Sequence, residues 1–206
     1  MDCSGDIAAF ILAGGKSSRM GTDKAFVELN GRTLLARALG LARSVTPEVF
    51  IVGSAEKFSA FAPVVEDEFA GCGPLGGIHA ALRASRRDCN LILAVDLPFL
   101  SFALLQFVIG RARKSGAPLA TVPRSDGMWQ PLCAVYRREF AEAAERALRA
   151  GRYKIDPLFG EVAVTAIQED ELAEAGFASR IFSNLNTPGD LQAAVGQRTE
   201  RTELRS

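Results

Sequence analysis

The feature that most constrains the fold of this 206-residue chain is an apolar run that leads into a glycine-rich, cationic loop. Residues 7–12 are uniformly apolar, which is typical of a strand covered on both faces. The next segment, 13–24, carries glycines at 14, 15 and 21 and cations at 16, 19 and 24. Glycine lets backbone N–H groups approach an anion, and α/β proteins bind phosphates at such strand ends. We therefore predict a phosphate loop, and three cations suit a triphosphate better than a single phosphate.

Two familiar phosphate motifs do not fit this loop. A Walker A motif ending in Gly15-Lys16-Ser17 would need a glycine at the position of Phe10. The dinucleotide fingerprint G-x-G-x-x-G is broken because Gly14 and Gly15 are adjacent and Lys16 follows. The loop is thus of another kind. The alternative is a tight turn with solvated cations, which is less favoured because turns rarely need so many positive charges.

Composition narrows the classes of protein and of partner. With 48% hydrophobic and 23% charged residues, the chain is ordinary for a soluble globular domain and long enough for one full core. Its formal net charge of +0 provides no overall field to attract nucleic acid or an anionic membrane. We expect a cytoplasmic location, no nucleic-acid partner and no membrane association. The four cysteines lack metal-site spacing, so reduced thiols are expected.

Strand and helix patterns alternate along the first two thirds of the chain. Strands are predicted at 7–12, 48–52, 64–65, 91–95, 117–122, 132–136, 162–167 and 181–182. Helices are predicted from Thr33, over 57–62, 78–85, 101–114 and 139–149, and over 189–195. This order predicts an α/β fold, a single Rossmann-like three-layer α/β/α domain over 1–195 with a mostly parallel mixed sheet. Residues 196–206 are polar and are expected to form a disordered tail.

Two carboxylates follow predicted strands at the edge where the loop lies. Asp96 ends the apolar run 91–95, and a carboxylate at that place is well suited to hold Mg²⁺ beside a triphosphate. The alternative is a turn residue ahead of Pro98 or a cap on the next helix. Asp67 follows the short strand at 64–65 and is open to three interpretations: a ribose contact, a metal ligand or a solvated member of an acidic run.

Four motifs together resemble the molybdenum cofactor guanylyltransferases of the nucleotidyltransferase superfamily. They lie at 12–24 (Leu-Ala-Gly-Gly-x-Ser-x-Arg-Met-Gly-x-Asp-Lys), 73–77 (Gly-Pro-Leu-Gly-Gly), 96–100 (Asp-Leu-Pro-Phe-Leu) and 184–188 (Asn-Leu-Asn-Thr-Pro). The resemblance implies a fold similar to that of the nucleotide-diphospho-sugar transferases. It also implies that GTP and Mo-molybdopterin react, with Mg²⁺, to a guanine dinucleotide cofactor and pyrophosphate. Molybdoenzymes or their chaperones are possible further partners.

The same resemblance assigns roles to individual residues. The catalytic set is Arg19, Lys24 and Asp96, with Asp96 as the metal ligand. The nucleotide-binding set is Leu12, Ala13, Gly14, Gly15, Lys24, Gly53, Asp67 and Asp96. The substrate-binding set on the pterin side is Gln130, Lys154, Asn184 and Asn186.

One position departs from the family pattern, which often places an asparagine where this chain has Gly53. That weakens any contact from a side chain to the base at this loop, although backbone groups of Gly53 remain available. The single histidine, His79, lies in a helical pattern and is expected to pack or cap rather than act as a base. Trp129 is open to two interpretations: a pterin contact or an anchor for its loop. Arg152 and Lys154 form a second basic pair that is open to two interpretations, a contact to the pterin phosphate or a solvated face, and the solvated face is favoured for Arg152.

The double glycine at 14 and 15 favours a guanine nucleotide, because cytidylyltransferase relatives often have alanine at the first of these positions. A molybdopterin cytidylyltransferase or another NTP-dependent nucleotidyltransferase is the near alternative. A regulatory module that binds nucleotide without turning it over is the alternative of a different class. Retention of Arg19, Lys24 and Asp96 argues against the regulatory module.

Overall fold

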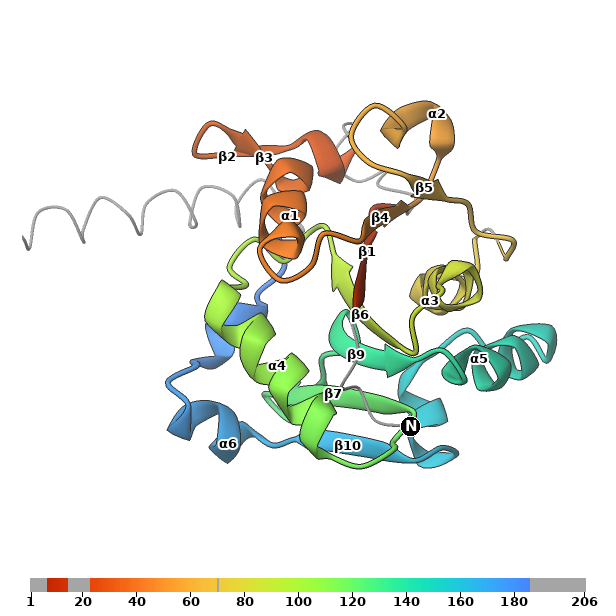
Figure 1. Ribbon diagram of the computed structural model, residues 1–206, viewed down its shortest axis with the longest axis vertical. Helices are drawn as coiled ribbons and strands as arrows, with labels where there is room; N and C mark the ends of the chain where they lie inside the picture. Colours follow the sequence, from red (N-terminus) through yellow and green to blue (C-terminus); the bar gives the residue numbers. More distant parts are fainter. Residues whose placement is uncertain (1–6, 15–22, 70, 186–206) are drawn as a thin grey trace, which may run out of the picture.

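The computed structural model describes residues 7–14, 23–69 and 71–185, which form a central sheet between two layers of helices (Figure 1). The strands of this sheet are β1 (Ala8–Leu12), β4 (Val49–Val52), β5 (Val64–Val65), β6 (Cys89–Ala94), β7 (Ala120–Ser125), β8 (Met128–Trp129), β9 (Cys133–Arg137) and β10 (Val164–Ile167). The helices are α1 (Leu34–Arg43), α2 (Ala55–Phe58), α3 (Pro74–Ala84), α4 (Phe102–Lys114), α5 (Phe140–Arg149) and α6 (Glu169–Glu174). Three short 3₁₀ turns, η1 (Lys24–Phe26), η2 (Asp156–Gly160) and η3 (Ser179–Phe182), and a hairpin of β2 (Glu28–Leu29) and β3 (Arg32–Thr33) complete the described elements.

The sheet is mixed and mostly parallel, as the sequence predicts. Its strand order is β10-β7-β9-β6-β1-β4-β5, and β8 pairs with β7. Strand β1 pairs in parallel with both β4 and β6, and β4 pairs in parallel with β5. Strand β9 runs antiparallel to its neighbours β6 and β7. The carboxyl ends of β1, β4, β5 and β6 therefore meet along one edge, where open α/β sheets bind their ligands.

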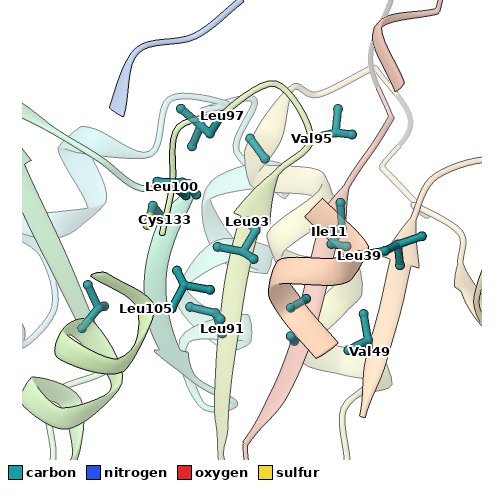
Figure 2. Packing of buried hydrophobic residues seen from close by; sticks show 14 of the residues in the cluster. Ile11, Leu39, Val49, Leu91, Leu93, Val95, Leu97, Leu100, Leu105 and Cys133 are labelled. Atoms are coloured by element: carbon teal, nitrogen blue, oxygen red, sulfur yellow. The ribbon is translucent and has the colours of Figure 1, made fainter. Parts of the chain in front are cut away.

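Two apolar cores cover the two faces of the sheet. On one face, α1 and α4 pack over side chains that include Ile11, Val49, Leu91 and Leu93 (Figure 2). On the other face, α3 and α5 pack over a second cluster that includes Phe10. Successive residues of a strand point to opposite faces, so neighbours in β1 serve different cores. Phe10 and Ile11 are both fully buried, which explains why the first strand is apolar at every position.

The start of α3 is the largest difference from the predicted elements. The sequence predicts a loop over 71–77 and a helix from residue 78, whereas the helix begins at Pro74. Proline suits the first helical position because its ring fixes φ and its missing N–H is not needed there. Gly76 and Gly77, which suggested a loop, lie inside the helix. Glycine is needed there because neighbouring side chains occupy the space that a Cβ would take.

Smaller differences concern short segments. The strand predicted at 181–182 is wrong, because the chain there forms η3, a turn that buries Phe182 without a strand partner. The helix predicted over 57–62 is found as α2, which begins at Ala55 and ends at Phe58, and α6 was not predicted. Thr33 and Ser101, at which two of the predicted helices start, are the N-caps of α1 and α4, since each side chain accepts a helix N–H. The helix predicted over 189–195 and the tail over 196–206 lie outside the described residues.

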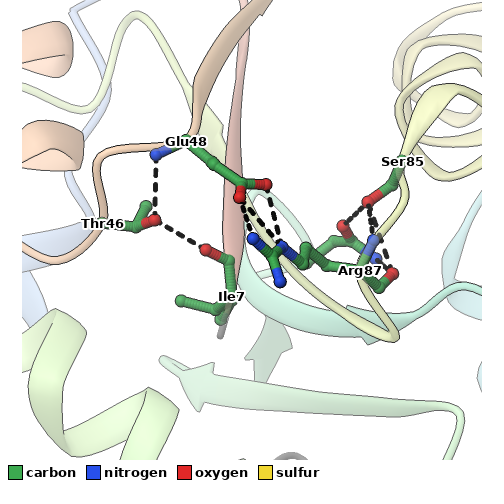
Figure 3. Close-up of polar contacts among 6 residues, drawn as sticks. Ile7, Thr46, Glu48, Ser85 and Arg87 are labelled. Carbon is green, nitrogen blue, oxygen red and sulfur yellow. Dashed lines mark hydrogen bonds and ion pairs between the residues drawn. The ribbon is translucent and has the colours of Figure 1, made fainter. Parts of the chain in front are cut away.

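A polar network ties together the amino-terminal ends of the central strands (Figure 3). Thr46 Oγ1 donates to the Ile7 carbonyl at 2.6 Å and accepts from Glu48 N at 3.1 Å. Arg87 Nε donates to both carboxylate oxygens of Glu48, at 3.0 and 2.9 Å. The hydrogen bond from Arg87 lowers the pKa of Glu48. This network lies at the sheet edge opposite the carboxyl ends, so we interpret it as structural.

The cysteines differ in state. Cys72 and Cys133 are free thiols, and burial raises the pKa of Cys133 to about 12. Cys89 is disulfide-bonded, so the prediction of reduced thiols is wrong for this residue. Within the described ranges, no helix combines the length and the apolar character that crossing a membrane requires.

The contact between α3 and β1 predicts opposite effects for two helical glycines. A Cβ at Gly77 would lie 2.5 Å from Leu12 Cδ2, whereas nothing lies within 4 Å of a Cβ at Gly110 in α4. We expect Gly77→Ala to lower the free energy of unfolding by about 1–3 kcal/mol through overpacking. We expect Gly110→Ala to be neutral or to raise it by up to about 1 kcal/mol, because alanine favours the helix. Urea unfolding of both variants measures this. A Gly77→Ala protein as stable as Gly110→Ala would contradict the close packing of α3 on β1.

Candidate nucleotide site

The end of β1 brings the first predicted nucleotide-binding residues to the carboxyl edge of the sheet. The Leu12 carbonyl accepts from Val95 N at 3.2 Å, and the amides of Ala13 and Gly14 donate to the Val52 carbonyl at 3.0 and 3.2 Å. The Leu12 and Ala13 side chains are buried, and Gly14 is exposed. The sheet therefore fixes the backbone up to Gly14, the point at which the chain leaves it for the predicted phosphate loop.

Gly53, which follows β4, lies beside Gly14. A Cβ on Gly14 would be 3.7 Å from the Gly53 Cα. The Gly53 amide donates to the Val65 carbonyl at 3.0 Å, so this N–H is already used by the sheet. A Cβ on Gly53 would lie 2.9 Å from the ring of Phe58, which is buried. The packing of Phe58 is thus a physical reason for glycine where the family pattern often has asparagine.

Asp67 follows β5 and lies against the first turn of α3. One carboxylate oxygen, Oδ1, accepts from Phe69 N at 2.8 Å. The other, Oδ2, lies 2.7 Å from where a Cβ of Gly76 would be. Because the next residue, Gly77, packs on Leu12, α3 links Asp67 to the end of β1. The carboxylate is half-buried and is held in place from two sides.

Lys24 and Asp96 form an ion pair at the centre of this edge. Lys24 Nζ lies 3.0 Å from Asp96 Oδ2, and the two side chains are 22% and 21% exposed. The partners come from η1 and from the segment after β6, 72 residues apart in the sequence. Two of the three residues that the sequence predicts to be catalytic are therefore in direct contact, and both keep some access to solvent.

Asp23 fixes the position of Lys24 and was missed by the sequence analysis. Its Oδ1 caps η1 by accepting from Ala25 N at 3.2 Å, and its Oδ2 lies 2.9 Å from Lys57 Nζ in α2. The ion pair with Asp23 raises the pKa of Lys57. The aromatic rings of Phe26 and Phe58 stack with centroids 5.8 Å apart and join the same two elements. The signal in the sequence is the acidic residue directly before η1, a common type of cap.

The residues that are predicted to bind the pterin-side substrate come from the carboxyl-terminal third of the described chain. Leu185 N donates to the Asp96 carbonyl at 3.1 Å, which brings the segment with the exposed Asn184 to the backbone of Asp96. Gln130 lies at the same edge, because β9 runs antiparallel to β6 and Leu132 accepts from Ala94 N at 2.9 Å. Both segments therefore end at the edge of the sheet that carries Asp96.

The loop around Trp129 is anchored by packing. The Trp129 ring meets Phe159 of η2 at a centroid distance of 5.0 Å, and the guanidinium of Arg124 lies 5.0 Å from the Trp129 ring centroid. Lys154 is exposed just before η2, and Arg152 pairs with Glu161. The interpretation of Trp129 as a loop anchor and of Arg152 as part of a solvated face fits these contacts.

Three of the predicted site residues, Gly15, Arg19 and Asn186, lie outside the described residues. Among the residues that the structure does describe, no cluster of three or more His, Cys, Asp or Glu side chains offers a metal site. A single carboxylate still fits Mg²⁺, which takes one or two carboxylates and completes its shell with water and phosphate oxygens. Asp96 Oδ1 accepts no hydrogen bond from the described part of the chain, so this oxygen is available to a cation.

Comparison with known proteins assigns the chain to a protein family. Residues 9–186 match the family described as "MobA-like NTP transferase domain". The chain belongs to this family. The match runs from the second residue of β1 past the end of η3 and includes the carboxyl end of every strand at the candidate site.

Individual relatives of this MobA-like chain agree with that assignment. A "Probable molybdenum cofactor guanylyltransferase" of Pelotomaculum thermopropionicum is 37% identical over 195 residues, which cover 93% of this chain and 94% of the relative. A "Molybdenum cofactor guanylyltransferase" of Desulfosudis oleivorans is 34% identical, with 91% and 94% covered. The crystal structure of "Molybdopterin-guanine dinucleotide biosynthesis protein A" from Archaeoglobus fulgidus superposes with a TM-score of 0.82 at 29% identity, covering 94% of this chain and 99% of the other.

The packing of Phe58 makes Gly53 a sensitive position in this MobA-like domain. We expect Gly53→Ala to lower the free energy of unfolding by about 1–3 kcal/mol, because the added methyl group overlaps the Phe58 ring. In a Phe58→Leu background the smaller side chain leaves room, so the same change should cost much less. Chemical unfolding of the two single variants and the double variant measures this coupling. Equal costs in both backgrounds would show that Phe58 is not what requires glycine at position 53.

Proposed function

We propose that this protein transfers GMP from GTP to Mo-molybdopterin, giving the molybdopterin guanine dinucleotide cofactor and pyrophosphate. The observation that carries the proposal is the pairing of Lys24 with Asp96 at the carboxyl edge of a MobA-like NTP transferase domain. The names of the two relatives, both guanylyltransferases, support GTP as the nucleotide. The proposal includes a cytoplasmic location and delivery of the product to molybdoenzymes or their chaperones.

In this proposal, Asp96 and Lys24 divide the work of handling the triphosphate. Asp96 would hold Mg²⁺, because a carboxylate is a ligand type that this ion prefers. When bound, Mg²⁺ supplies positive charge that neutralises the phosphate oxygens around the reacting phosphorus. Lys24, which contacts Asp96, directs its ammonium group toward the triphosphate, and Arg19 adds a second cation. Neutralisation of the charge on the leaving pyrophosphate lowers the barrier because the charge grows in the transition state.

The reaction itself needs little proton chemistry from the protein. The terminal phosphate of the pterin attacks the α-phosphorus of GTP, a new P–O bond forms, and the bond to the β-phosphate oxygen breaks as pyrophosphate leaves. The nucleophile is already an anion, so a strong general base is not required. His79 is 2% exposed and lies inside the α3 packing, which agrees with a reaction that depends on positioning and charge.

The two substrates approach from opposite ends of the site in this proposal. The nucleoside lies over Gly14, Gly15 and Gly53, with Asp67 as its polar contact and Leu12 and Ala13 beneath. The pterin lies on the side of Asn184 and Asn186, with Gln130 and Lys154 as further contacts. Figure 1 shows the elements in the same order, with β1, β4 and β5 on one side of β6 and β9 and β7 on the other.

A nucleotide panel tests the proposed function directly. Purified protein is supplied with Mg²⁺, Mo-molybdopterin and either GTP or CTP, and pyrophosphate release is followed. GTP should support release, and CTP should support much less. Turnover with CTP alone would make the protein a cytidylyltransferase, and nucleotide binding without any pyrophosphate release would make it a regulatory module.

Lys24 and Lys57 form a matched pair for testing the role of the cation. Each has a carboxylate partner, but Lys57 pairs with Asp23 on an exposed surface, at 54% exposure against 22% for Lys24. We expect Lys24→Ala to weaken GTP binding on the order of ten- to a hundredfold, since it removes a charge-assisted contact to phosphate. Lys57→Ala should have a much smaller effect on GTP binding because it removes only an exposed pair. Calorimetry on both variants measures the affinity for GTP. Equal small losses of affinity would show that these cations provide only a general positive potential and no specific contact to phosphate.

Asp96 is tested through its dependence on Mg²⁺. Asp96→Asn keeps the size of the side chain but removes the charge that binds the cation. We expect turnover to fall by at least about tenfold at limiting Mg²⁺ and to recover partly as Mg²⁺ is raised, while the circular dichroism spectrum stays that of the wild type. Wild-type turnover of Asp96→Asn at limiting Mg²⁺ would rule out the metal role.

A further inference from the structure

The buried histidine of α3 makes contacts that the proposed chemistry does not use. His79 is 2% exposed, and neither ring nitrogen has a hydrogen-bond partner within the described ranges. Its ring meets the ring of Phe69 edge-on, with centroids 5.1 Å apart and an interplanar angle of 82°. On α5, the Glu145 carboxylate lies 3.8 Å from Nε2 of His79. The pKa of Glu145 is lowered, chiefly by its hydrogen bond from Arg149, so this carboxylate is charged at neutral pH.

Phe69 belongs to the turn that carries Asp67. The Phe69 amide donates to Asp67 Oδ1 at 2.8 Å, and the Phe69 carbonyl accepts from Cys72 N at 3.1 Å. The orientation of the Asp67 carboxylate therefore depends on where the Phe69 backbone lies. The Phe69 ring is half-buried, and its edge contact with His79 is the aromatic contact that holds this turn against α3.

Two residues of α3 face this turn. Gly76 and His79 are three positions apart, so they lie on the same face of the helix. A Cβ at Gly76 would be 2.7 Å from Asp67 Oδ2 and 3.0 Å from the Phe69 carbonyl oxygen. Gly76 leaves room for the turn to lie on the helix backbone, and His79 contacts the aromatic ring of Phe69. Helix α3 lies between this turn and α5 (Figure 1).

Stability alone does not explain a histidine at this position. A buried imidazole without a hydrogen-bond partner carries a desolvation cost that an aliphatic side chain of similar size would not. The ring nevertheless provides two contacts that leucine cannot, a T-shaped aromatic contact with Phe69 and a polar atom near Glu145. Its contribution is thus expected in the placement of its neighbours rather than in the strength of the core.

We propose that His79 is a positioning residue for nucleotide binding, which fixes Phe69 and thereby aims the Asp67 carboxylate at the nucleoside of GTP. Glu145 faces the imidazole from α5 and holds the ring in the orientation that Phe69 meets. The inference rests on the proposed function, specifically on the role of Asp67 toward the nucleotide. In this proposal, the packing of α3 on α5 contributes to substrate binding.

A double-mutant cycle tests the proposal with GTP in the presence of Mg²⁺. His79→Leu is made in the wild type and in Asp67→Asn, and GTP affinity is measured by calorimetry. In the wild type we expect about three- to tenfold weaker binding, the range that corresponds to one aromatic pair. In Asp67→Asn we expect little further loss, because the effect acts through Asp67. The melting temperature of His79→Leu should be unchanged or higher. An equal loss in both backgrounds, or no loss in the wild type, would overturn the proposal.

Phe69→Leu provides a second variant at a half-buried position, and leucine keeps an apolar side chain there. It should reproduce the affinity loss of His79→Leu, and wild-type affinity in this variant would overturn the proposal. Val108→Ala in α4, on the other face of the sheet, is the control for lost stability and should leave GTP affinity unchanged. Unchanged affinity in Asp67→Asn itself would overturn the nucleoside role of Asp67, and with it this inference. A loss in Asp67→Asn with none in His79→Leu would overturn this inference alone.

Discussion

The burial of β1 on both faces is the constraint on which the rest of the structure depends. This strand lies between β4 and β6, and its residues alternate between the two cores. A polar side chain at any of its five positions would lose its hydration and would lower the stability of the fold. Polar chemistry is therefore confined to the loops beyond the strand ends. The four parallel strands of this half of the sheet all end at one edge, and their loops bring Gly14, Gly53, Asp67 and Asp96 together there.

The loops at this edge are held by close packing against backbone. The Phe58 ring fills the space beside Gly53, the Asp67 carboxylate lies on Gly76, and Leu12 lies on Gly77. Each contact joins a loop of the site to an element that also belongs to a core. Protein interiors resist deformation because they are packed at high density, so loops attached in this way keep their geometry. A site that works by positioning charges needs that rigidity more than it needs reactive groups.

Among the described residues, charge at the site is arranged in ion pairs, one of them partly buried and the other exposed. Lys24 pairs with Asp96, and its neighbour Asp23 pairs with Lys57, so η1 is tied to the sheet on one side and to α2 on the other. Such pairs contribute little to stability when they are exposed, but they fix the direction of long side chains. The neutral net charge of the chain agrees with this arrangement, since the attraction for a triphosphate is local.

The sequence by itself determined the fold class, the central strands and the family, because apolar periodicity and the glycine-rich motif depend on neighbours close along the chain. It also placed Lys24, Asp67 and Asp96 at one sheet edge, since parallel strands share their carboxyl ends. Only the tertiary structure decided that α3 begins at Pro74, that Phe58 requires glycine at position 53, and that His79 meets Phe69 and Glu145. The contacts at Gly53 and His79 depend on the space and the neighbours that tertiary packing gives to a side chain, and the pattern of apolar residues along the chain does not encode them.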